Sequence, residues 1–314
     1  MNKEKILITR EIPKHFLEPL HNQFEIIQVQ DNQHYDKILQ QNLSDISALL
    51  CMLSDNINAE TISKAHNLKI IANYAVGFNN IDLQQASKQG IIVTNTPDIL
   101  TDATADLTFS LLLNCARNYQ QARNFILNNQ WSRWEAKKLL GMELKGKTLG
   151  VYGLGRIGQA VARRAEAFGM NIIYHNRSKK NVPYDYVSFE TLLETSDVIS
   201  LHCPLNEQSK LRFSKNEFNK MKTGSIFINT ARGEMHNEQD LSQALQDKHL
   251  FAAGLDVTNP EPCSPESALL KLDNCYITPH IGSATFAARN GMVKICTENI
   301  INVLTGKDPI SKVN

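Results

Sequence analysis

Short apolar runs alternate with amphipathic segments along the chain, a pattern typical of strands and helices that follow one another in turn. Before residue 100 the runs are KILIT (5–9), FEIIQV (24–29), ISALLCML (46–53), LKIIANY (68–74) and IIVTN (91–95). They are nearly continuously apolar, as expected of parallel strands that helices cover on both faces. The pattern therefore predicts an α/β unit with a doubly wound parallel sheet in this part of the chain.

A second series of apolar runs follows a long segment of helical pattern that extends from Asp102 to about Asn128. The runs are KTLGVYG (147–153), MNIIYHN (170–176), DVISLHCP (197–204), GSIFINTAR (224–232), FAAGLDV (251–257) and CYITPHIG (275–282). They predict a second doubly wound parallel sheet, because helical segments separate them. A closing helix is predicted from Ala284 to Leu304, and we expect it to pack back on the first unit.

Composition narrows the functions that such a protein can have. The 314 residues fit two domains of common size, and 33 Lys and Arg residues balance 32 Asp and Glu residues. The formal net charge of +1 gives no electrostatic reason to expect nucleic acid or a membrane surface as partner. Six cysteines are scattered without a CxxC pair, which predicts reduced thiols and no metal site. Since we see no signal segment and no apolar stretch of roughly 18 residues, we expect a cytoplasmic protein that acts on a small molecule.

The segment GVYGLGRIGQ contains three glycines in GxGxxG spacing, between a predicted strand and a predicted helix. In that context the spacing is typical of a turn that binds a dinucleotide. Gly153 permits the tight turn, Gly155 lets a pyrophosphate approach the backbone, and Gly158 lets the helix pack closely on the strand. Arg156 and Ile157 begin the helix, so their backbone N–H groups and the positive end of the helix dipole face the phosphates.

Three polar residues follow strands of the second series, at the sheet edge where ligands bind in open parallel sheets. Arg232 closes SIFINTAR, Glu261 lies in the NPEP turn after GLDV, and His280 closes YITPH. Taken singly, each also fits a solvated or structurally satisfied side chain. Together they suit the reduction of a keto acid: the guanidinium holds a carboxylate, and the histidine, with a carboxylate on its second nitrogen, protonates the carbonyl oxygen. Asp256 can accept a hydrogen bond from the carboxamide of a nicotinamide cofactor.

The motifs GLGRIG, NTARGE, GLDVTNPEP and TPHIGSAT together resemble those of the D-2-hydroxyacid dehydrogenase family, and the similarity covers nearly the whole chain. In that family the arginine, glutamate and histidine of these motifs are catalytic, which implies the same roles for Arg232, Glu261 and His280. The resemblance also implies a flavodoxin-like substrate-binding domain of residues 1–100 with 284–314. An inserted Rossmann domain of residues 101–283 would bind the dinucleotide.

Within the family, the segments CMLSDNI, TPDILTDATADL, WSRWE and DVTNPEP are most similar to those of glyoxylate/hydroxypyruvate reductases. This similarity implies an NAD(P)-dependent oxidoreductase that reduces a small 2-keto acid to the D-2-hydroxy acid, with glyoxylate or hydroxypyruvate as substrate. The expected substrate contacts are Leu53, Val76, Gly77, Trp134, Arg232 and His280, with the backbone amides of Val76 and Gly77 on the carboxylate. Further cofactor contacts are expected at Cys203, Pro204, Thr230, Ala231, Asp256 and Gly282.

The end of NIIYHNRSKK predicts which dinucleotide is preferred. Sites specific for NAD place an Asp or Glu there, which binds the ribose 2′-hydroxyl and repels a 2′-phosphate. This chain has Asn176 at that position, followed by Arg177, Ser178, Lys179 and Lys180. Three cations and a hydroxyl group suit a phosphate, so NADP(H) is predicted to be preferred, with NAD(H) possible as an alternative. A solvated basic loop without a ligand is the other interpretation of this run.

A homodimer is predicted through the dinucleotide domains. In the reductases that WSRWE resembles, a tryptophan of this arm approaches the substrate pocket of the neighbouring subunit, and Trp134 matches it better than Trp131. The arm, around Gln130 to Lys138, would then reach toward the partner. The alternative is that both tryptophans belong to the core of their own subunit.

Other functions stay open beside this one. A dinucleotide-sensing binding protein, similar to the transcriptional corepressors of the same fold, would keep Arg232, Glu261 and His280. A dehydrogenase for another 2-hydroxy acid is a second alternative. A phosphoglycerate dehydrogenase would often carry a C-terminal regulatory domain, which we do not expect because the chain ends at Asn314. A formate dehydrogenase of the family would be expected to have Gln where this chain has Glu261.

Overall fold

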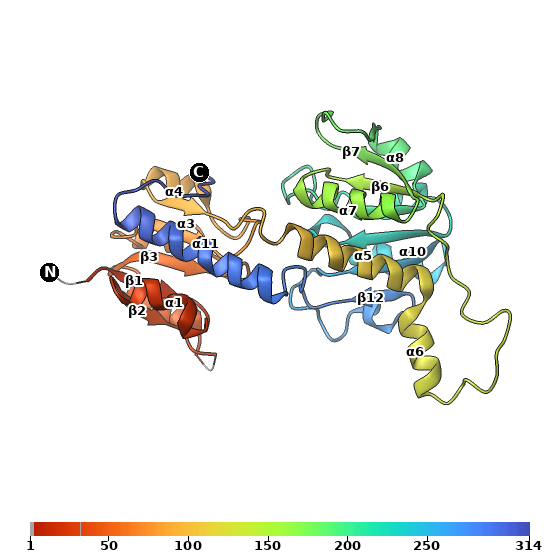
Figure 1. Cartoon of the computed structure of the whole chain (residues 1–314), viewed down its shortest axis with the longest axis horizontal. Helices are drawn as coiled ribbons and strands as arrows, with labels where there is room; N and C mark the ends of the chain where they lie inside the picture. The colour runs from red at the N-terminus through yellow and green to blue at the C-terminus, as the bar shows by residue number, and fades with distance from the viewer. Residues whose placement is uncertain (1–2, 32) are drawn as a thin grey trace. The chain divides into compact units, whose positions relative to one another are not determined.

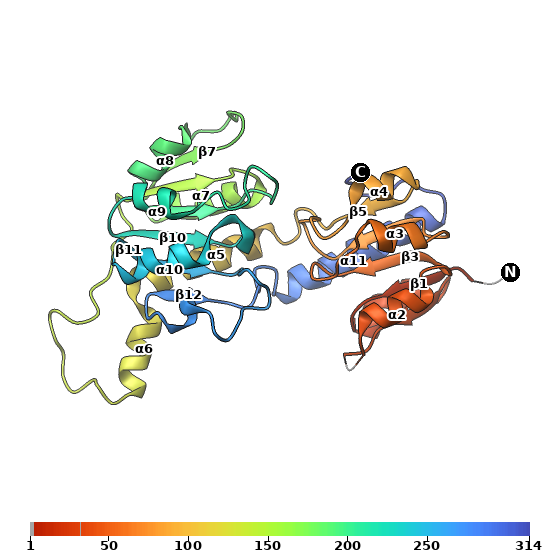
Figure 2. The same ribbon diagram turned by 180° about the vertical axis from the view of Figure 1, so that it is seen from behind.

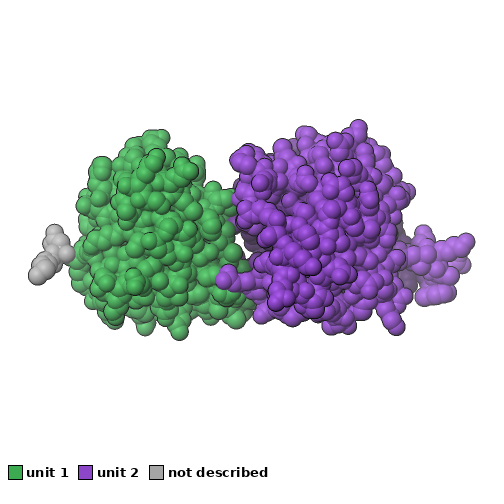
Figure 3. Space-filling model, turned by 90° about the horizontal axis from the view of Figure 1, so that it is seen from above, with its two compact units in different colours: residues 1–100, 284–314 green, residues 101–283 purple. Residues whose placement is uncertain are grey.

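The computed structural model describes residues 3–31 and 33–314, which divide into two compact units. Unit 1 comprises residues 1–100 and 284–314, and unit 2 comprises residues 101–283 (Figure 3). Each unit is built on one parallel sheet with helices on its faces (Figure 1). The predicted fold class, α/β with two doubly wound sheets, is thereby confirmed.

The sheet of unit 1 has five strands in the order β2-β1-β3-β4-β5. Its strands are β1 (Lys5–Ile8), β2 (Glu25–Gln28), β3 (Ile46–Cys51), β4 (Ile70–Asn73) and β5 (Ile92–Thr94). Every ladder is parallel, and this order is the one found in flavodoxin-like sheets. All residues of the central strands β3 and β4 are buried, which explains why their sequences are nearly continuously apolar.

Helices cover both faces of this sheet. They are α1 (Lys14–His21), α2 (Tyr35–Asn42), α3 (Ala59–Lys64), α4 (Leu83–Lys88) and α11 (Phe286–Leu304). The side chains of Asn58 and Asp82 cap α3 and α4 by accepting backbone N–H groups of their first turns. Helix α11 packs against α1, β3 and β4, and the chain after it returns to β5, where Lys312 pairs with Thr94 (Figure 2).

The sheet of unit 2 has seven strands in the order β12-β11-β10-β9-β6-β7-β8. They are β6 (Thr148–Tyr152), β7 (Asn171–His175), β8 (Asp185–Tyr186), β9 (Val198–Leu201), β10 (Ser225–Asn229), β11 (Leu250–Leu255) and β12 (Cys275–Ile277). All ladders are parallel, and the strand order reverses between β6 and β9, the point where such sheets bind ligands. Strand β8 was not predicted, because its two residues are exposed and carry no apolar signal.

The helices of unit 2 are α5 (Thr101–Arg117), α6 (Tyr119–Leu127), α7 (Arg156–Ala167), α8 (Phe189–Thr195), α9 (Lys215–Lys220) and α10 (Glu238–Gln246), with short 3-10 helices η1 (Gly233–Met235) and η2 (Ala268–Lys271). The prediction of one helix from Asp102 to about Asn128 is wrong. Asn118 has a φ of 51° and separates α5 from α6, and its amide donates to the Leu140 carbonyl at 2.9 Å. Asn tolerates this left-handed conformation better than most residues, so the helix turns here.

Among residues 3–31 and 33–314, no helix combines the length and the apolar character that crossing a membrane requires. The same residues contain no group of three or more His, Cys, Asp or Glu side chains that could hold a metal ion.

Candidate active site

Apart from Trp134, the residues predicted to act on substrate and dinucleotide in unit 2 follow the carboxyl ends of six strands. These residues are Gly153, Gly155, Arg156, Ile157 and Gly158 after β6, Asn176, Arg177, Ser178 and Lys180 after β7, Cys203 and Pro204 after β9, Thr230, Ala231 and Arg232 after β10, Asp256 and Glu261 after β11, and His280 and Gly282 after β12. Because the strands are parallel, all these positions lie at one edge of the sheet.

The three glycines of the turn between β6 and α7 differ in what a side chain would meet. Gly153 has a φ of 100°, and a Cβ atom there would lie 2.5 Å from the amide nitrogen of Cys203. A Cβ atom on Gly158 would lie 2.4 Å from the carbonyl oxygen of Gly153. A Cβ atom on Gly155 would meet nothing within 4 Å, so packing does not require glycine there. The open space lies at the N-terminus of α7, where a pyrophosphate would fit against the helix start.

The loop after β7 is built around Asn176. Its Oδ1 atom accepts the Leu154 backbone N–H at 2.7 Å, so the amide ties this loop to the glycine turn. Arg177, Lys179 and Lys180 are exposed, and the three cations form no ion pair within residues 3–31 and 33–314. The buried Tyr174 hydroxyl holds the backbone of Lys180 through its N–H group at 2.8 Å. The side-chain amide of Asn176 therefore lies at the carboxyl end of β7, directly before these exposed cations.

Cys203 lies against the glycine turn, as the contact with Gly153 shows. Burial raises the pKa of its thiol to about 12, so the thiol is protonated at neutral pH. Cys203 can therefore line a ligand site but is a poor nucleophile.

His280 and Glu261 form a side-chain pair. The Nδ1 atom of His280 contacts the Oε1 atom of Glu261 at hydrogen-bonding distance, and the two side chains are 27% and 41% exposed. Within residues 3–31 and 33–314, the Nε2 atom of His280 makes no hydrogen bond. The second ring nitrogen is thus available to a substrate oxygen, while the first one is held by a carboxylate.

Asp256 shapes the loop that carries His280. Its buried carboxylate accepts hydrogen bonds from the Thr278 hydroxyl at 2.7 Å, the Ile281 N–H at 2.8 Å and the Gly282 N–H at 2.7 Å. Burial raises the pKa of this carboxyl, although the three hydrogen bonds oppose the shift. The sequence interpretation gave Asp256 a contact with the cofactor only, and its bonds to this loop are an additional role.

Arg232 is held by residues that the sequence interpretation passed over. The Asn229 amide donates to the Arg232 carbonyl at 2.8 Å and accepts the Ala231 N–H at 2.9 Å. Gly233 follows, and a Cβ atom there would lie 2.1 Å from the carbonyl oxygen of Thr258. The loop after β10 thus presses directly on the loop that leads to Glu261. Asn229 and Gly233 both belong to the motif NTARGE, but only the structure shows that they hold the Arg232 loop in place.

The charge of Arg232 is influenced by this neighbourhood. Burial lowers the pKa of its guanidinium, and the negative charges of Glu261 and Glu234 oppose that shift. Glu261 therefore acts electrostatically on Arg232, and its Oε1 atom contacts His280.

The predicted substrate residues of unit 1 follow its own strands. Leu53 lies in the turn after β3, and Val76 and Gly77 lie in the loop after β4, so all three are at the carboxyl edge of this sheet. In unit 2, Trp134 is 85% exposed and Trp131 is 65% exposed, which excludes the alternative that they belong to the core of their own subunit.

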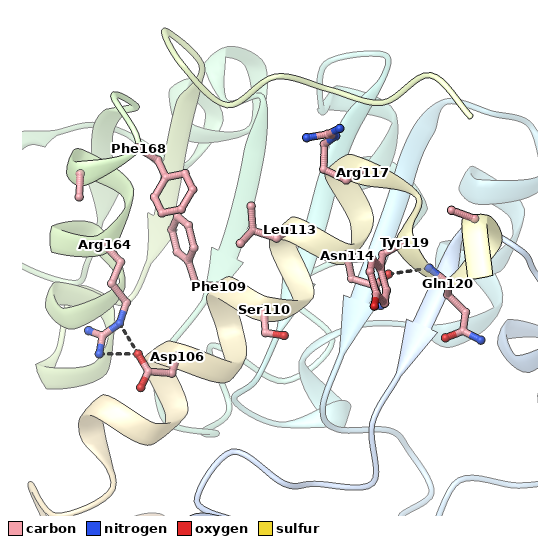
Figure 4. A pocket seen from close by; sticks show the side chains of 12 residues that line it. Asp106, Phe109, Ser110, Leu113, Asn114, Arg117, Tyr119, Gln120, Arg164 and Phe168 are labelled. Carbon is pink, nitrogen blue, oxygen red and sulfur yellow. Dashed lines mark hydrogen bonds and ion pairs between the residues drawn. The ribbon is translucent and has the colours of Figure 1, made fainter. Parts of the chain in front are cut away.

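A separate groove of unit 2, with a volume of about 1030 Å³, runs along α5 and reaches α7 and the start of α6 (Figure 4). The rings of Phe109 and Phe168 lie in it with their centroids 4.7 Å apart and their planes tilted by 46°, and Arg164 forms an ion pair with Asp106 at 2.7 Å. Large exposed apolar side chains continue from the groove along α6, the arm and the two residues that follow the arm, namely Tyr119, Ile126, Leu127, Trp131, Trp134, Leu139 and Leu140.

Comparison with known proteins identifies the family. The sequence model for the NAD binding domain of D-isomer specific 2-hydroxyacid dehydrogenases matches residues 109–282. The glyoxylate reductase of Thermococcus litoralis is 43% identical, with 99% of this chain and 97% of the relative covered. The chain belongs to this family. The glyoxylate reductase of Pyrococcus horikoshii is similar at 42% identity, over 99% of this chain and 96% of its own.

Solved structures support the assignment of this chain to the dehydrogenase family. A Thermus thermophilus protein superposes with a TM-score of 0.94 at 42% identity, covering 99% of this chain and 100% of its own. The NADPH-dependent glyoxylate/hydroxypyruvate reductase of Sinorhizobium meliloti, in complex with NADP and malonate, has a TM-score of 0.90 at 31% identity, covering 99% and 97%. The predicted enzyme class, an NAD(P)-dependent 2-hydroxyacid dehydrogenase that reduces 2-keto acids, is confirmed.

The glycine turn gives a prediction that separates structure from binding. Gly155→Ala should leave the melting temperature of the enzyme unchanged, since the new methyl group meets only open space, but should weaken dinucleotide binding at least tenfold. Gly153→Ala should lower the free energy of unfolding by about 2 kcal/mol, because of its positive φ and its clash with Cys203. Thermal unfolding and calorimetric titration with NADPH measure the two effects. A Gly155→Ala enzyme that binds NADPH normally would exclude the pyrophosphate from this turn.

Proposed function

We propose that the dehydrogenase reduces glyoxylate or hydroxypyruvate to the corresponding D-2-hydroxy acid, with Arg232, Glu261 and His280 as the catalytic residues. The observation that carries the proposal is the pair of Glu261 and His280, which leaves Nε2 of the imidazole available to a substrate oxygen. The curated relatives named glyoxylate reductase support the choice of substrate.

Each of these side chains has a distinct task. The guanidinium of Arg232 binds the carboxylate and the 2-oxygen of the keto acid, since a planar fork of donors suits both acceptors. The imidazolium of His280 donates its Nε2 proton to the 2-oxygen as that oxygen becomes negative, and Glu261 stabilises the imidazolium beforehand. When bound, the nicotinamide supplies the hydride to the 2-carbon. The backbone N–H groups of Val76 and Gly77 bind the substrate carboxylate, and Leu53 and Trp134 select its side chain.

The residues of the glycine turn and of the loops after β7, β9, β10 and β12 fit a dinucleotide. The pyrophosphate would lie over Gly155, Arg156 and Ile157, where a Cβ atom at position 155 would meet only open space. Cys203, Pro204, Thr230, Ala231 and Gly282, with Asp256, would line the rest of the dinucleotide. We assign a preference for NADPH to the loop after β7, because Asn176 carries no negative charge and Arg177, Ser178 and Lys180 offer donors to a 2′-phosphate.

A homodimer through unit 2 accounts for its exposed apolar surface. Helix α6 has no buried residue, and its apolar side chains continue into those of the groove and the arm. Contiguous apolar surfaces of this extent mark contacts between proteins more often than free surface. A second copy of the chain is the occupant we propose, with Trp134 of the arm reaching the partner. We also expect the enzyme to act in the cytoplasm.

The catalytic assignment predicts how two variants behave. His280→Ala should lose at least a hundredfold in turnover of glyoxylate while NADPH binds normally, since the proton donor is missing. Glu261→Gln should lower turnover less than His280→Ala does, because the imidazole keeps its proton donor but loses the carboxylate that holds its Nδ1 atom. Steady-state rates between pH 5 and pH 9 test both. Near-normal turnover by His280→Ala on every active keto acid would remove His280 from the mechanism, and normal turnover by Glu261→Gln would remove Glu261.

The cofactor assignment predicts a preference for NADPH of roughly ten- to a hundredfold in kcat/KM, as one charge-assisted contact of about 1.5–3 kcal/mol provides. Arg177→Ala should lower kcat/KM for NADPH and leave the value for NADH nearly unchanged. Lys220→Ala, an exposed cation at the end of α9, is the matched control and should change neither. Equal values for the two cofactors in the wild type would refute the preference.

The dimer predicts the effect of a charge on α6. Leu127→Asp should convert a dimer to a monomer at micromolar concentration, because a carboxylate would be buried against the partner. Leu270→Asp changes a side chain that is 50% exposed outside the groove and the arm, so the dimer should persist. Light scattering measures both masses. A monomeric wild-type protein would contradict the proposal directly.

A further inference from the structure

In the loop after β4 of unit 1, hydrogen bonds hold three successive carbonyl groups in fixed directions. The Ala75 carbonyl accepts the backbone N–H of Thr96 at 2.9 Å. The Val76 carbonyl accepts the side-chain amide of Asn95 at 2.9 Å, and the Gly77 carbonyl accepts that of Asn73 at 2.7 Å. None of these partners is a neighbour within the loop itself, so other parts of unit 1 determine the orientation of the loop.

Fixing a carbonyl group also fixes an N–H group. The peptide bonds of this loop are trans, and in a trans peptide the C=O and N–H groups point in opposite directions. The bond to Thr96 therefore orients the N–H of Val76, and the bond to Asn95 orients the N–H of Gly77. In the same way, Asn73 orients the N–H of Phe78.

These three N–H groups donate no hydrogen bond to any residue within 3–31 and 33–314. Backbone donors without a protein partner must be met by water or by a ligand, and adjacent oriented N–H groups suit an anion. We infer that Asn95 is a positioning residue, which holds the Val76–Gly77 peptide so that its N–H faces the substrate carboxylate. This inference rests on the proposed function for the identity of the ligand.

Asn95 is itself held by the end of the chain. The Ser311 hydroxyl donates to the Asn95 carbonyl at 2.6 Å, and the Asn95 N–H donates to the Ser311 carbonyl at 3.2 Å. Behind them lies Asn299 of α11, which is fully buried. Its amide donates to the Ser311 hydroxyl at 2.9 Å and accepts the Ile310 N–H at 2.7 Å. A chain of hydrogen bonds thus runs from α11 through the tail to the Val76 carbonyl.

Asn73 completes the arrangement from the other side. It is fully buried at the end of β4, and its Oδ1 atom accepts the Asn80 amide at 3.3 Å. The same Asn80 amide donates to the carbonyls of Met52 and Asp55, both at 3.1 Å. The loop after β3, which contains Leu53, is therefore fixed together with the loop after β4.

The test uses the full-length enzyme with saturating NADPH and oxalate, a two-carbon dicarboxylate that cannot be reduced. Asn95→Ala should raise the Kd of oxalate roughly tenfold, since the Gly77 N–H loses its fixed direction. The KM for glyoxylate should rise by the same factor while kcat changes less than about twofold, because the carboxylate is bound equally before and during the reaction. The Kd of NADPH should not change.

Asn67→Ala is the matched control. Asn67 makes the same kind of bond, from its amide to the Ser44 carbonyl at 2.6 Å, in the same unit but away from this loop. All four measured values should stay at the wild-type level. Ser311→Ala is a second variant that acts one step further along the chain of bonds, and it should raise the Kd of oxalate by a smaller factor than Asn95→Ala.

Outcomes separate this inference from the proposed function. If oxalate binds Asn95→Ala and Ser311→Ala as tightly as it binds the wild type, the positioning role is overturned. A parallel loss of NADPH affinity in both variants would also overturn it, because it would show a general disturbance. If the wild type turns over neither glyoxylate nor hydroxypyruvate, yet oxalate affinity falls in Asn95→Ala, the proposed substrate is wrong and the positioning role is supported.

Discussion

Parallel pairing throughout both sheets places the carboxyl ends of all strands of a sheet at a single edge. In unit 2 this constraint gathers residues that are far apart in the sequence, such as the glycine turn after β6 and His280 after β12. In unit 1 it does the same for the loops after β3 and β4. In such a fold the functional residues lie in loops, and the order of the strands determines which loops are neighbours.

Close backbone contacts then refine what the strand order begins. At Gly153 and Gly233 the chain passes so near another segment that no side chain fits, against Cys203 in one case and Thr258 in the other. The second contact joins the loop of Arg232 to the loop of Glu261. The absence of a side chain at Gly233 therefore allows the loop of the guanidinium to pack against the loop of the carboxylate that raises its pKa. Asp256 holds the loop that carries His280 through three hydrogen bonds.

The sequence predicts much of this fold because its signals are local. Buried parallel strands such as β3 are nearly continuously apolar, and a glycine turn between a strand and a helix has a recognisable spacing. Strand β8 has no such signal, since it has two exposed residues, and the break at Asn118 depends on one residue in a left-handed conformation. The residues of the candidate site and their expected roles could be inferred from motifs, but the contacts that hold these residues in place could not. That Asn229 holds the Arg232 loop, and that Asn95 meets the Val76 carbonyl, depends on contacts between segments that sequence patterns do not describe.

The fixed carbonyls of the loop after β4 have a consequence for small substrates. A two-carbon acid has very few atoms with which to bind, so it cannot supply much free energy to organise a flexible loop around itself. Here the amides of Asn73 and Asn95 order the loop when the protein folds, and the ligand finds the donors already aligned. A larger keto acid could compensate for a disordered loop with contacts to its side chain. The smallest substrates lack such contacts. Their affinity should therefore depend more strongly on the rigidity of this loop than the affinity of any larger acid does.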